Sequence, residues 1–198
     1  EIYIHRPEQK VLKLDGSRKE RQELLAEQAD LYLLNYEGLQ SYVTKLERGK
    51  GRVIDHKAAQ EFGSLFSGAI FDESHQIGNK NSLRFRMCHA VSKHMAVRYA
   101  LTGTPFGRNP EKLWSQFFIV DHGVTLGDTL GLFRAAFFHA KENYWGGIDY
   151  VFDQSKMTQL NRLIRHRSIR YRDEEFSDLP RIVRKIHRLS FGVDAKEY

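Results

Sequence analysis

Two adjacent carboxylates, Asp72 and Glu73, come directly after the apolar residues Ala69-Ile70-Phe71. A short apolar run of this kind is typical of a buried strand, so the pair is expected at the carboxyl end of one. At such a position one carboxylate can orient a Mg²⁺ ion bound between phosphates, and the other can accept a proton from an attacking water molecule. Because most Asp-Glu pairs only cap the helix that follows, this pair alone does not establish a phosphoryl-transfer site.

A turn of glycine, proline and hydroxyl residues, Leu101-Thr102-Gly103-Thr104-Pro105, follows about one strand and one helix later. Taken singly it is an ordinary turn, since Gly and Pro interrupt regular structure and hydroxyls satisfy nearby backbone groups. Two such motifs in this order, each at the end of a buried strand and separated by one helix, are much less common by accident. Together they indicate one site at the carboxyl edge of a sheet.

The elements needed to position these motifs alternate between strand and helix patterns. Ser17 and Glu20 have the spacing of a capping box, and Asn109 with Pro110 suits a helix start. Strands joined through crossover helices pair in parallel, so the prediction is an α/β fold with an open, mainly parallel sheet flanked by helices. We expect strands at 11–14, 31–34 (buried on both faces), 67–71 and 97–101, and helices at 17–29, 36–46, 56–66, 82–95 and from Pro110 onwards.

The alternation stops after Val120. The aromatic and Gly-bearing stretch 133–147 is expected to form helices attached to the sheet, with its aromatic side chains in the core and not stacked on bases. A second unit is expected to begin near Ser168, and residues 182–189 alternate like a strand.

The two motifs and their flanks resemble the Swi/Snf group within helicase superfamily two. The segment Ile70–Asn79 (IFDESHQIGN) resembles that group's second motif, a DEAH variant, and Leu101–Trp114 (LTGTPFGRNPEKLW) resembles its third. Three weaker similarities flank them: Leu14–Arg21 (LDGSRKER) to a Gly-Ser-x-x-x-Arg segment, Leu31–Leu39 (LYLLNYEGL) to a strand that ends in a Tyr-Glu pair, and Asp178–Tyr198 to the approach to the second motor lobe. The resemblance covers nearly the whole chain and is specific at the first two segments.

This resemblance implies a RecA-like lobe that is incomplete at its N-terminus and has a helical C-terminal extension. Residues 1–120 would be the partial ATPase lobe, 121–167 a helical insertion and 168–198 the start of the linker to the second lobe. The implied cofactors are ATP and Mg²⁺, and the implied partners are duplex DNA and the second RecA-like lobe of the same parent chain. The parent protein would couple ATP hydrolysis to movement along duplex DNA.

The resemblance also implies roles for individual residues. Asp72 would organise Mg²⁺, mainly through water, Glu73 would be the catalytic base, and His75 would link the nucleotide to the rest of the motor. The turn after the second strand would couple the state of ATP to lobe movement and DNA contact through Thr102, Gly103 and Thr104.

Contact with nucleic acid is implied at one helix start and in one loop. Asn35 and Tyr36 would face a DNA phosphate, because backbone N–H groups at a helix N-terminus bind anions. Asn35 replaces the hydroxyl residue that is common in the family at this point. Arg108, in the loop after the turn Thr102-Gly103-Thr104-Pro105, is a further candidate for this contact.

A phosphate-binding loop of the Gly-x-x-x-x-Gly-Lys-Ser/Thr type is missing from the sequence. Gly49-Lys50 fails as a match, since Thr44 stands where the first glycine is needed and Gly51 where the hydroxyl residue should follow. In the family this loop lies N-terminal to the motifs seen here. We therefore expect an excised part of a longer protein that does not hydrolyse ATP by itself.

Composition and charge fit an intracellular protein with a polyanionic partner. The 198 residues carry a formal net charge of +6, and the basic groups gather at 18–21, 45–52 and 162–172, where a plain solvated surface is an equally good interpretation. No apolar run approaches the roughly 20 residues of a membrane span. Cys88 is the only cysteine, which excludes an intramolecular disulfide and suggests a reducing compartment, the cytoplasm or, in a eukaryote, the nucleus.

Other interpretations stay open beside the Swi/Snf one. A strand-separating helicase or a restriction-type translocase shares the motif pair, and a non-catalytic nucleic-acid or protein-binding module could keep the fold without hydrolysis. Cys88, His89 and His94 lack a fourth partner and a known spacing, so a zinc site is rejected.

Overall fold

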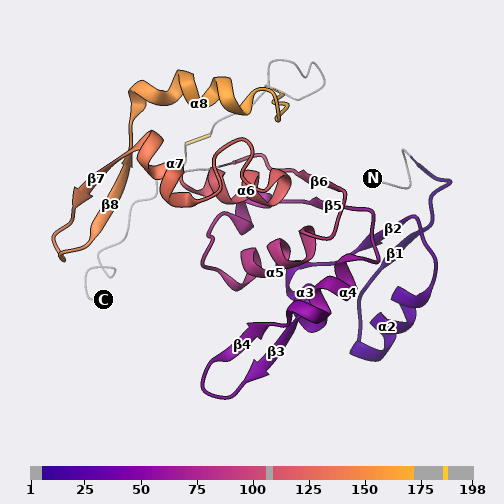
Figure 1. Cartoon of the computed structure of the whole chain (residues 1–198). Helices are drawn as coiled ribbons and strands as arrows, with labels where there is room; N and C mark the ends of the chain where they lie inside the picture. Colours follow the sequence, from indigo (N-terminus) through magenta and orange to yellow (C-terminus); the bar gives the residue numbers. More distant parts are fainter. Residues whose placement is uncertain (1–5, 106–108, 172–184, 187–198) are drawn as a thin grey trace, which may run out of the picture. The chain divides into compact units, whose positions relative to one another are not determined.

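The structure, a computed structural model, describes residues 6–105, 109–171 and 185–186 of the chain (Figure 1). The chain divides into two units, residues 1–167 and 168–198. In the second unit, residues 168–171 and 185–186 are described, and they form neither helix nor strand. The strand expected at 182–189 and the similarity at Asp178–Tyr198 therefore lie almost wholly outside the described residues, and the domain boundary near Ser168 as the start of a linker stays a prediction.

Two pairs of parallel strands carry the α/β part of the first unit. Strand β1 (Val11–Lys13) pairs with β2 (Leu31–Leu33), and β5 (Gly68–Phe71) pairs with β6 (Val97–Ala100). Helix α2 (Arg18–Ala26) joins the first pair. Crossover connections through helices and parallel pairing confirm the predicted fold class.

Helix α2 and the next three helices begin where the sequence predicts. Ser17 accepts a hydrogen bond from the Glu20 N–H at 3.3 Å, and the Glu20 carboxylate accepts one from the Ser17 N–H at 2.6 Å, which forms the expected capping box of α2. Helices α3 (Tyr36–Val43), α4 (His56–Gly63), α5 (Leu83–Ser92) and α6 (Lys112–Asp121) follow. Helix α5 supplies the most buried set of side chains, namely Phe85, Met87, Cys88, Ala90 and Val91.

The structure corrects two expectations, the burial of the strands on both faces and the first residue of α6. Neither strand pair is buried on both faces: Leu33 is 42% exposed, and Ile70 and Tyr99, cross-strand partners in the second pair, are exposed while Phe71 on the opposite face is buried. Helix α6 starts at Lys112 and not at Pro110, because the Lys112 N–H bonds back three residues, to the carbonyl of Asn109, in a tight first turn.

A β-hairpin replaces the end of the helix predicted at 36–46. Helix α3 ends at Val43, and β3 (Thr44–Glu47) pairs antiparallel with β4 (Gly51–Ile54). Gly49 and Gly51 have φ angles of +80° and +75°, so the turn uses backbone conformations that other residues adopt rarely. These glycines lie in the basic segment 45–52. The strands on either side were not predicted because their apolar and polar residues do not clearly alternate.

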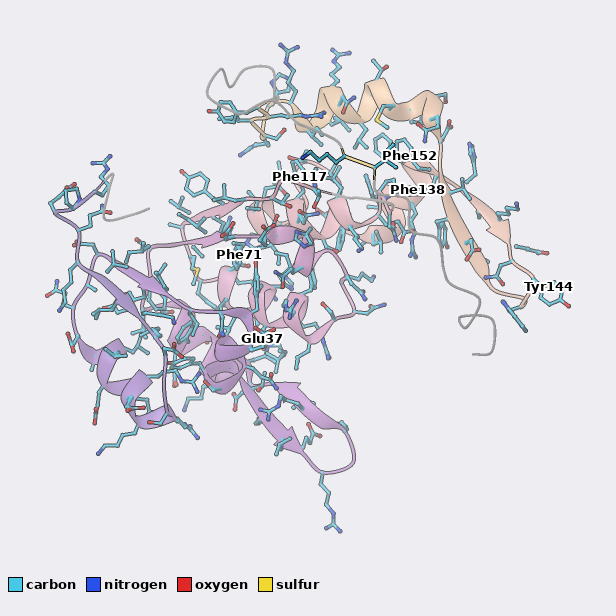
Figure 2. The ribbon with its side chains drawn as sticks, turned by 180° about the vertical axis from the view of Figure 1, so that it is seen from behind. Glu37, Phe71, Phe117, Phe138, Tyr144 and Phe152 are labelled. Atoms are coloured by element: carbon cyan, nitrogen blue, oxygen red, sulfur yellow. The ribbon has the colours of Figure 1, made fainter. Side chains whose placement is uncertain are left out.

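A second hairpin corrects the prediction for the aromatic stretch. Helix α7 (Leu130–Phe137) is followed by β7 (Phe138–Glu142) and β8 (Ile148–Phe152), which pair antiparallel, and then by α8 (Met157–Ile164). Figure 2 shows Phe138 and Phe152 together at the base of this hairpin and Tyr144 at its tip. Core packing is confirmed for Phe133, Phe137 and Phe138 but is wrong for Tyr144 and Trp145, which are 93% and 88% exposed.

In the part of the chain that the structure describes, no helix is long and apolar enough to cross a membrane.

Histidine 89 generates a prediction about stability, because it packs half-buried in the aromatic cluster between α5 and α6. Its ring lies 5.8 Å from Phe85 and 5.1 Å from Phe118, and burial, assisted by Lys93 and His122, lowers its pKa to about 4. Between pH 6.5 and about 4 the unfolded chain binds this proton and the folded chain does not, so the free energy of unfolding should fall as the pH falls.

Urea unfolding at several pH values from 7 to 5 tests this. His89→Gln should show a shallower loss, by up to about 1 kcal/mol per pH unit, less than the full titration value because the ring is half exposed. Equal slopes for the two proteins would contradict the assignment.

Candidate functional site

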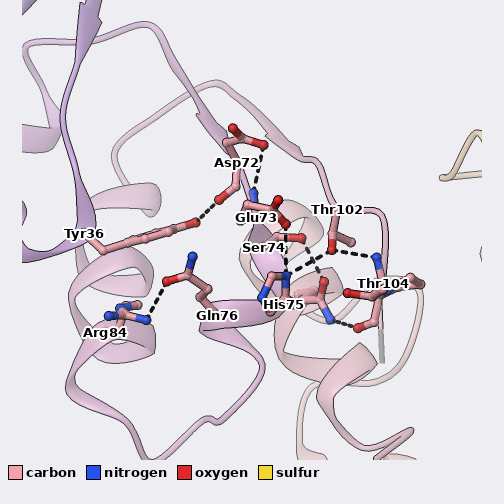
Figure 3. A network of polar contacts seen from close by, with 11 residues as sticks. Tyr36, Asp72, Glu73, Ser74, His75, Gln76, Arg84, Thr102 and Thr104 are labelled. Atoms are coloured by element: carbon pink, nitrogen blue, oxygen red, sulfur yellow. Dashed lines mark hydrogen bonds and ion pairs between the residues drawn. The ribbon is translucent and has the colours of Figure 1, made fainter. Parts of the chain in front are cut away.

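The two motifs lie side by side at the carboxyl ends of β5 and β6 (Figure 3). The backbone ladder continues past both strands: the Leu101 N–H donates to the Phe71 carbonyl at 2.9 Å, and the Ser74 N–H donates to the Leu101 carbonyl at 2.8 Å. The motif that begins at Asp72 and the turn that begins at Thr102 are thereby held together by main-chain hydrogen bonds. The site that the sequence predicted from the motif order is brought together by the fold.

The backbone at Glu73 separates the two carboxylates. Its φ and ψ are both 47°, a left-handed conformation that costs a non-glycine residue about 1–2 kcal/mol. After this residue the chain enters the short 3₁₀ helix η1 (Ser74–Ile77). The side chains of Asp72 and Glu73 point in different directions as a result, so that one can act on a metal and the other on water (Figure 3).

Asp72 has the properties expected of a Mg²⁺ ligand. Its side chain is exposed, and its Oδ1 accepts a hydrogen bond from the Glu73 N–H at 2.9 Å. Within the described residues no group of three or more His, Cys, Asp or Glu side chains could hold a metal ion. A single carboxylate fits Mg²⁺, which keeps several water ligands and binds largely through phosphates.

His75 connects the carboxylate motif to the turn. Its Nδ1 lies 3.1 Å from Glu73 Oε2 and 3.4 Å from Thr102 Oγ1, and Thr102 Oγ1 accepts a hydrogen bond from the Thr104 N–H at 3.1 Å. A proton on Nδ1 is the arrangement that satisfies the carboxylate. Glu73, His75, Thr102 and Thr104 therefore form one continuous polar chain, with Gly103 between the two threonines.

Tyr36 supports Asp72 from α3. Its hydroxyl donates to the Asp72 carbonyl at 2.7 Å, and burial raises the pKa of the phenol, which keeps the donor protonated. Asn35 caps the same helix, with Oδ1 accepting a hydrogen bond from the Gly38 N–H. Contact of Asn35 and Tyr36 with DNA stays a prediction, and Arg108 lies outside the described residues.

Arg84 braces this support. Its guanidinium lies over the Tyr36 ring at 5.4 Å, forms an ion pair with Glu37 and donates to Gln76 Oε1 at 2.7 Å. The sequence analysis missed this residue, because its partners come from two other elements and no local pattern joins them.

Gln116 links α6 to both motifs from the buried side. Ser74 Oγ donates to Gln116 Oε1 at 2.8 Å, and Gln116 Nε2 donates to the carbonyls of Pro105 and Lys112. Ser74 and Gln116 are 1% and 4% exposed, so neither has water as an alternative partner. A glutamine inside the apolar run Leu113-Trp114-Ser115-Gln116-Phe117 was the one sequence signal that could have revealed the contact.

Comparisons with known proteins were made for the whole chain. The family model described as SNF2-related domain matches residues 1–197. Among solved structures, the chain is similar to a Sulfolobus solfataricus SWI2/SNF2 ATPase core in complex with dsDNA, with a TM-score of 0.60 and 20% sequence identity. The match covers 90% of this chain and 32% of that one, so this chain spans about a third of the length of the archaeal protein. No curated protein matches.

The buried Ser74–Gln116 contact gives a second prediction. In Gln116→Leu the Ser74 hydroxyl and the Pro105 carbonyl lose their partner inside the protein, which should lower the free energy of unfolding by about 1–3 kcal/mol. Gln60→Leu on the exposed face of α4 is the matched control and should change it by less than about 0.5 kcal/mol. Chemical denaturation measures both, and equal effects would show that the contact contributes nothing.

Proposed function

Since this chain belongs to the SNF2-related domain family, we propose that it provides the Mg²⁺-binding and water-activating residues of a Swi/Snf-type ATPase that moves along duplex DNA. The observation that carries the proposal is the polar chain from Glu73 through His75 to Thr102, which ties the hydrolytic carboxylate to the neighbouring turn. The match to the family model includes both Glu73 and Thr102.

The proposed chemistry uses the two carboxylates separately. Glu73, exposed and turned away from Asp72, accepts the proton of the water molecule that attacks the γ-phosphorus of ATP, while the bond from that phosphorus to the ADP oxygen breaks. Asp72 orients the water ligands of Mg²⁺. The metal ion, when bound, neutralises charge on the phosphate oxygens.

Coupling to movement follows from the hydrogen bonds of His75. Its Nδ1 lies within reach of both the Glu73 carboxylate and the Thr102 hydroxyl, so a proton gained by Glu73 weakens the first contact and favours the second. Thr102 in turn receives the Thr104 N–H, and Gln116 holds the Pro105 carbonyl at the end of the turn. A change of charge at the carboxylate is thereby transmitted to the backbone of the turn and to α6.

Duplex DNA is the proposed partner, together with a second RecA-like lobe. The structural neighbour was solved in complex with dsDNA, and this chain carries a net charge of +6. Both features favour a polyanionic partner such as duplex DNA. Strand separation is the runner-up, and an assay of strand release beside DNA-stimulated hydrolysis distinguishes the two in the complete motor.

The 198-residue chain by itself should not hydrolyse ATP. Its sequence holds no phosphate-binding loop, so nothing aligns the β- and γ-phosphates with Asp72 and Glu73. Phosphate release with and without duplex DNA should stay at the buffer level. Turnover comparable to a complete motor would show that these residues form a sufficient site.

In the complete motor, Glu73→Gln should abolish chemistry and spare binding. The amide keeps the size of the side chain but accepts no proton, so DNA-stimulated hydrolysis should fall by about 10²–10⁴ while ATP affinity changes little. Glu61→Gln on the exposed side of α4 removes one carboxylate elsewhere and should leave hydrolysis unchanged.

Thr104→Ala should separate hydrolysis from movement, because it keeps the Thr104 N–H that bonds to Thr102 and removes only the exposed hydroxyl through which the turn would transmit the nucleotide state. It should retain more ATPase activity than translocation. Near-normal hydrolysis in Glu73→Gln would show that Glu73 is not the base. Equal losses of ATPase activity and translocation in Thr104→Ala would show that the turn does not couple the two.

A further inference from the structure

A small cavity of about 90 Å³ lies between α2 and α3, away from the carboxylates. Its lining is polar and basic, and consists of Arg18, Arg21, Gln22, Ser41 and Tyr42. The Tyr42 hydroxyl donates to the Arg21 carbonyl at 3.3 Å and ties the two helices together beside the cavity. The cavity is therefore part of the folded packing of these helices.

One donor of the partly exposed Arg21 guanidinium, Nε, is buried without a partner. Within the described residues, Arg21 Nε is the one buried side-chain nitrogen or oxygen that has no hydrogen-bond partner. A buried donor on a charged group that lacks an acceptor is unfavourable. Nε has almost no accessible surface, so an acceptor from outside the chain could reach it only after the side chain shifts.

The acidic residues nearby form no ion pair with either arginine, although Lys13, helped by the charge of Arg21, lowers the pKa of Asp15. Asp15 pairs with Lys13 at 2.7 Å, and the Glu20 carboxylate accepts the hydrogen bond from the Ser17 N–H. Among the described residues neither Arg18 nor Arg21 has a carboxylate within 4.0 Å. Two positive groups thus line one cavity without a negative one.

Arg21 also reaches the first turn of α3. A Cβ atom at Gly38 would lie 3.4 Å from Arg21 Nη1 and 2.6 Å from the side-chain oxygen of Asn35, the residue that caps this helix. The N-terminal end of a helix carries partial positive charge, which adds to that of the guanidinium. The glycine leaves room for the side chains of Asn35 and Leu34, and the Arg21 guanidinium lies beside it at ordinary contact distance.

We propose that this cavity binds one phosphate group, held by the guanidinium groups of Arg21 and Arg18. A guanidinium presents paired N–H donors that match the oxygens of a phosphate. The source is either a backbone phosphodiester of duplex DNA or a free phosphate ion. The DNA source rests on the proposed function. Asn35 and Tyr36, which are expected to face a DNA phosphate, stand at the start of α3, the helix beside α2.

Binding of a fluorescent duplex of about 20 base pairs, measured without nucleotide at two salt concentrations, tests the DNA source. Arg21→Ala should weaken binding about tenfold and lower the salt dependence by about one phosphate contact, and Arg18→Ala should weaken it about threefold. Arg21→Lys keeps the charge but loses the paired donors, so it should weaken binding by between about threefold and about tenfold. Lys19→Ala removes the same charge from the same helix at a residue outside the cavity, next to Glu23, and should weaken binding about twofold or less.

Inorganic phosphate, added while the thermal midpoint is followed, tests the free-ion source. Stabilisation of the wild-type protein that Arg21→Ala and Arg18→Ala lack, with DNA binding unchanged, would assign the cavity to a free phosphate ion. If both arginine variants behave like Lys19→Ala toward both probes, the cavity binds no phosphate and the proposal is overturned. Because Arg18 is exposed, its variant keeps the test valid even if Arg21→Ala unfolds. Absence of nucleotide keeps the result independent of whether Glu73 is a catalytic base.

Discussion

The hydrogen-bond ladder between β5 and β6 is the interaction on which the candidate site depends. Parallel pairing aligns Phe71 with Ala100, and the two further bonds through Leu101 carry the pairing past the strand ends. Side chains that follow the two strands are therefore close together without any specific attraction between them. The Glu73–His75–Thr102 contacts use this proximity, and a shift of register by one residue would remove all of them at once.

The surroundings of the site show how packing and polarity are combined. Gln116 fixes the two motifs from a buried helix, and Tyr36 fixes the Asp72 backbone from the opposite side under the Arg84 guanidinium. The carboxylates of Asp72 and Glu73 themselves have few contacts and are exposed. Rigid, buried supports around exposed reactive groups are the arrangement in which a ligand can be bound without rearrangement of the backbone.

Local signals in the sequence predicted the elements, and contacts distant in the sequence were out of their reach. Ser17 with Glu20 marked a helix start because capping is an interaction between residues three apart, and the apolar runs before Asp72 and Thr102 marked strands for a similar reason. The Ser74–Gln116 bond joins residues 42 positions apart, and it depends on how α6 packs. Both hairpins were missed because their strands lack strict alternation, and aromatic residues such as Phe137 and Phe138 suit a helix and a strand equally well.

The left-handed backbone at Glu73 places stability and activity in opposition at a single residue. Glycine adopts this conformation without steric penalty, so selection for a stable fold alone would favour glycine at position 73. A glutamate in this strained conformation is what the proposed role of its carboxylate would explain. Variants chosen only for higher melting temperature would therefore tend to lose the glutamate at this position.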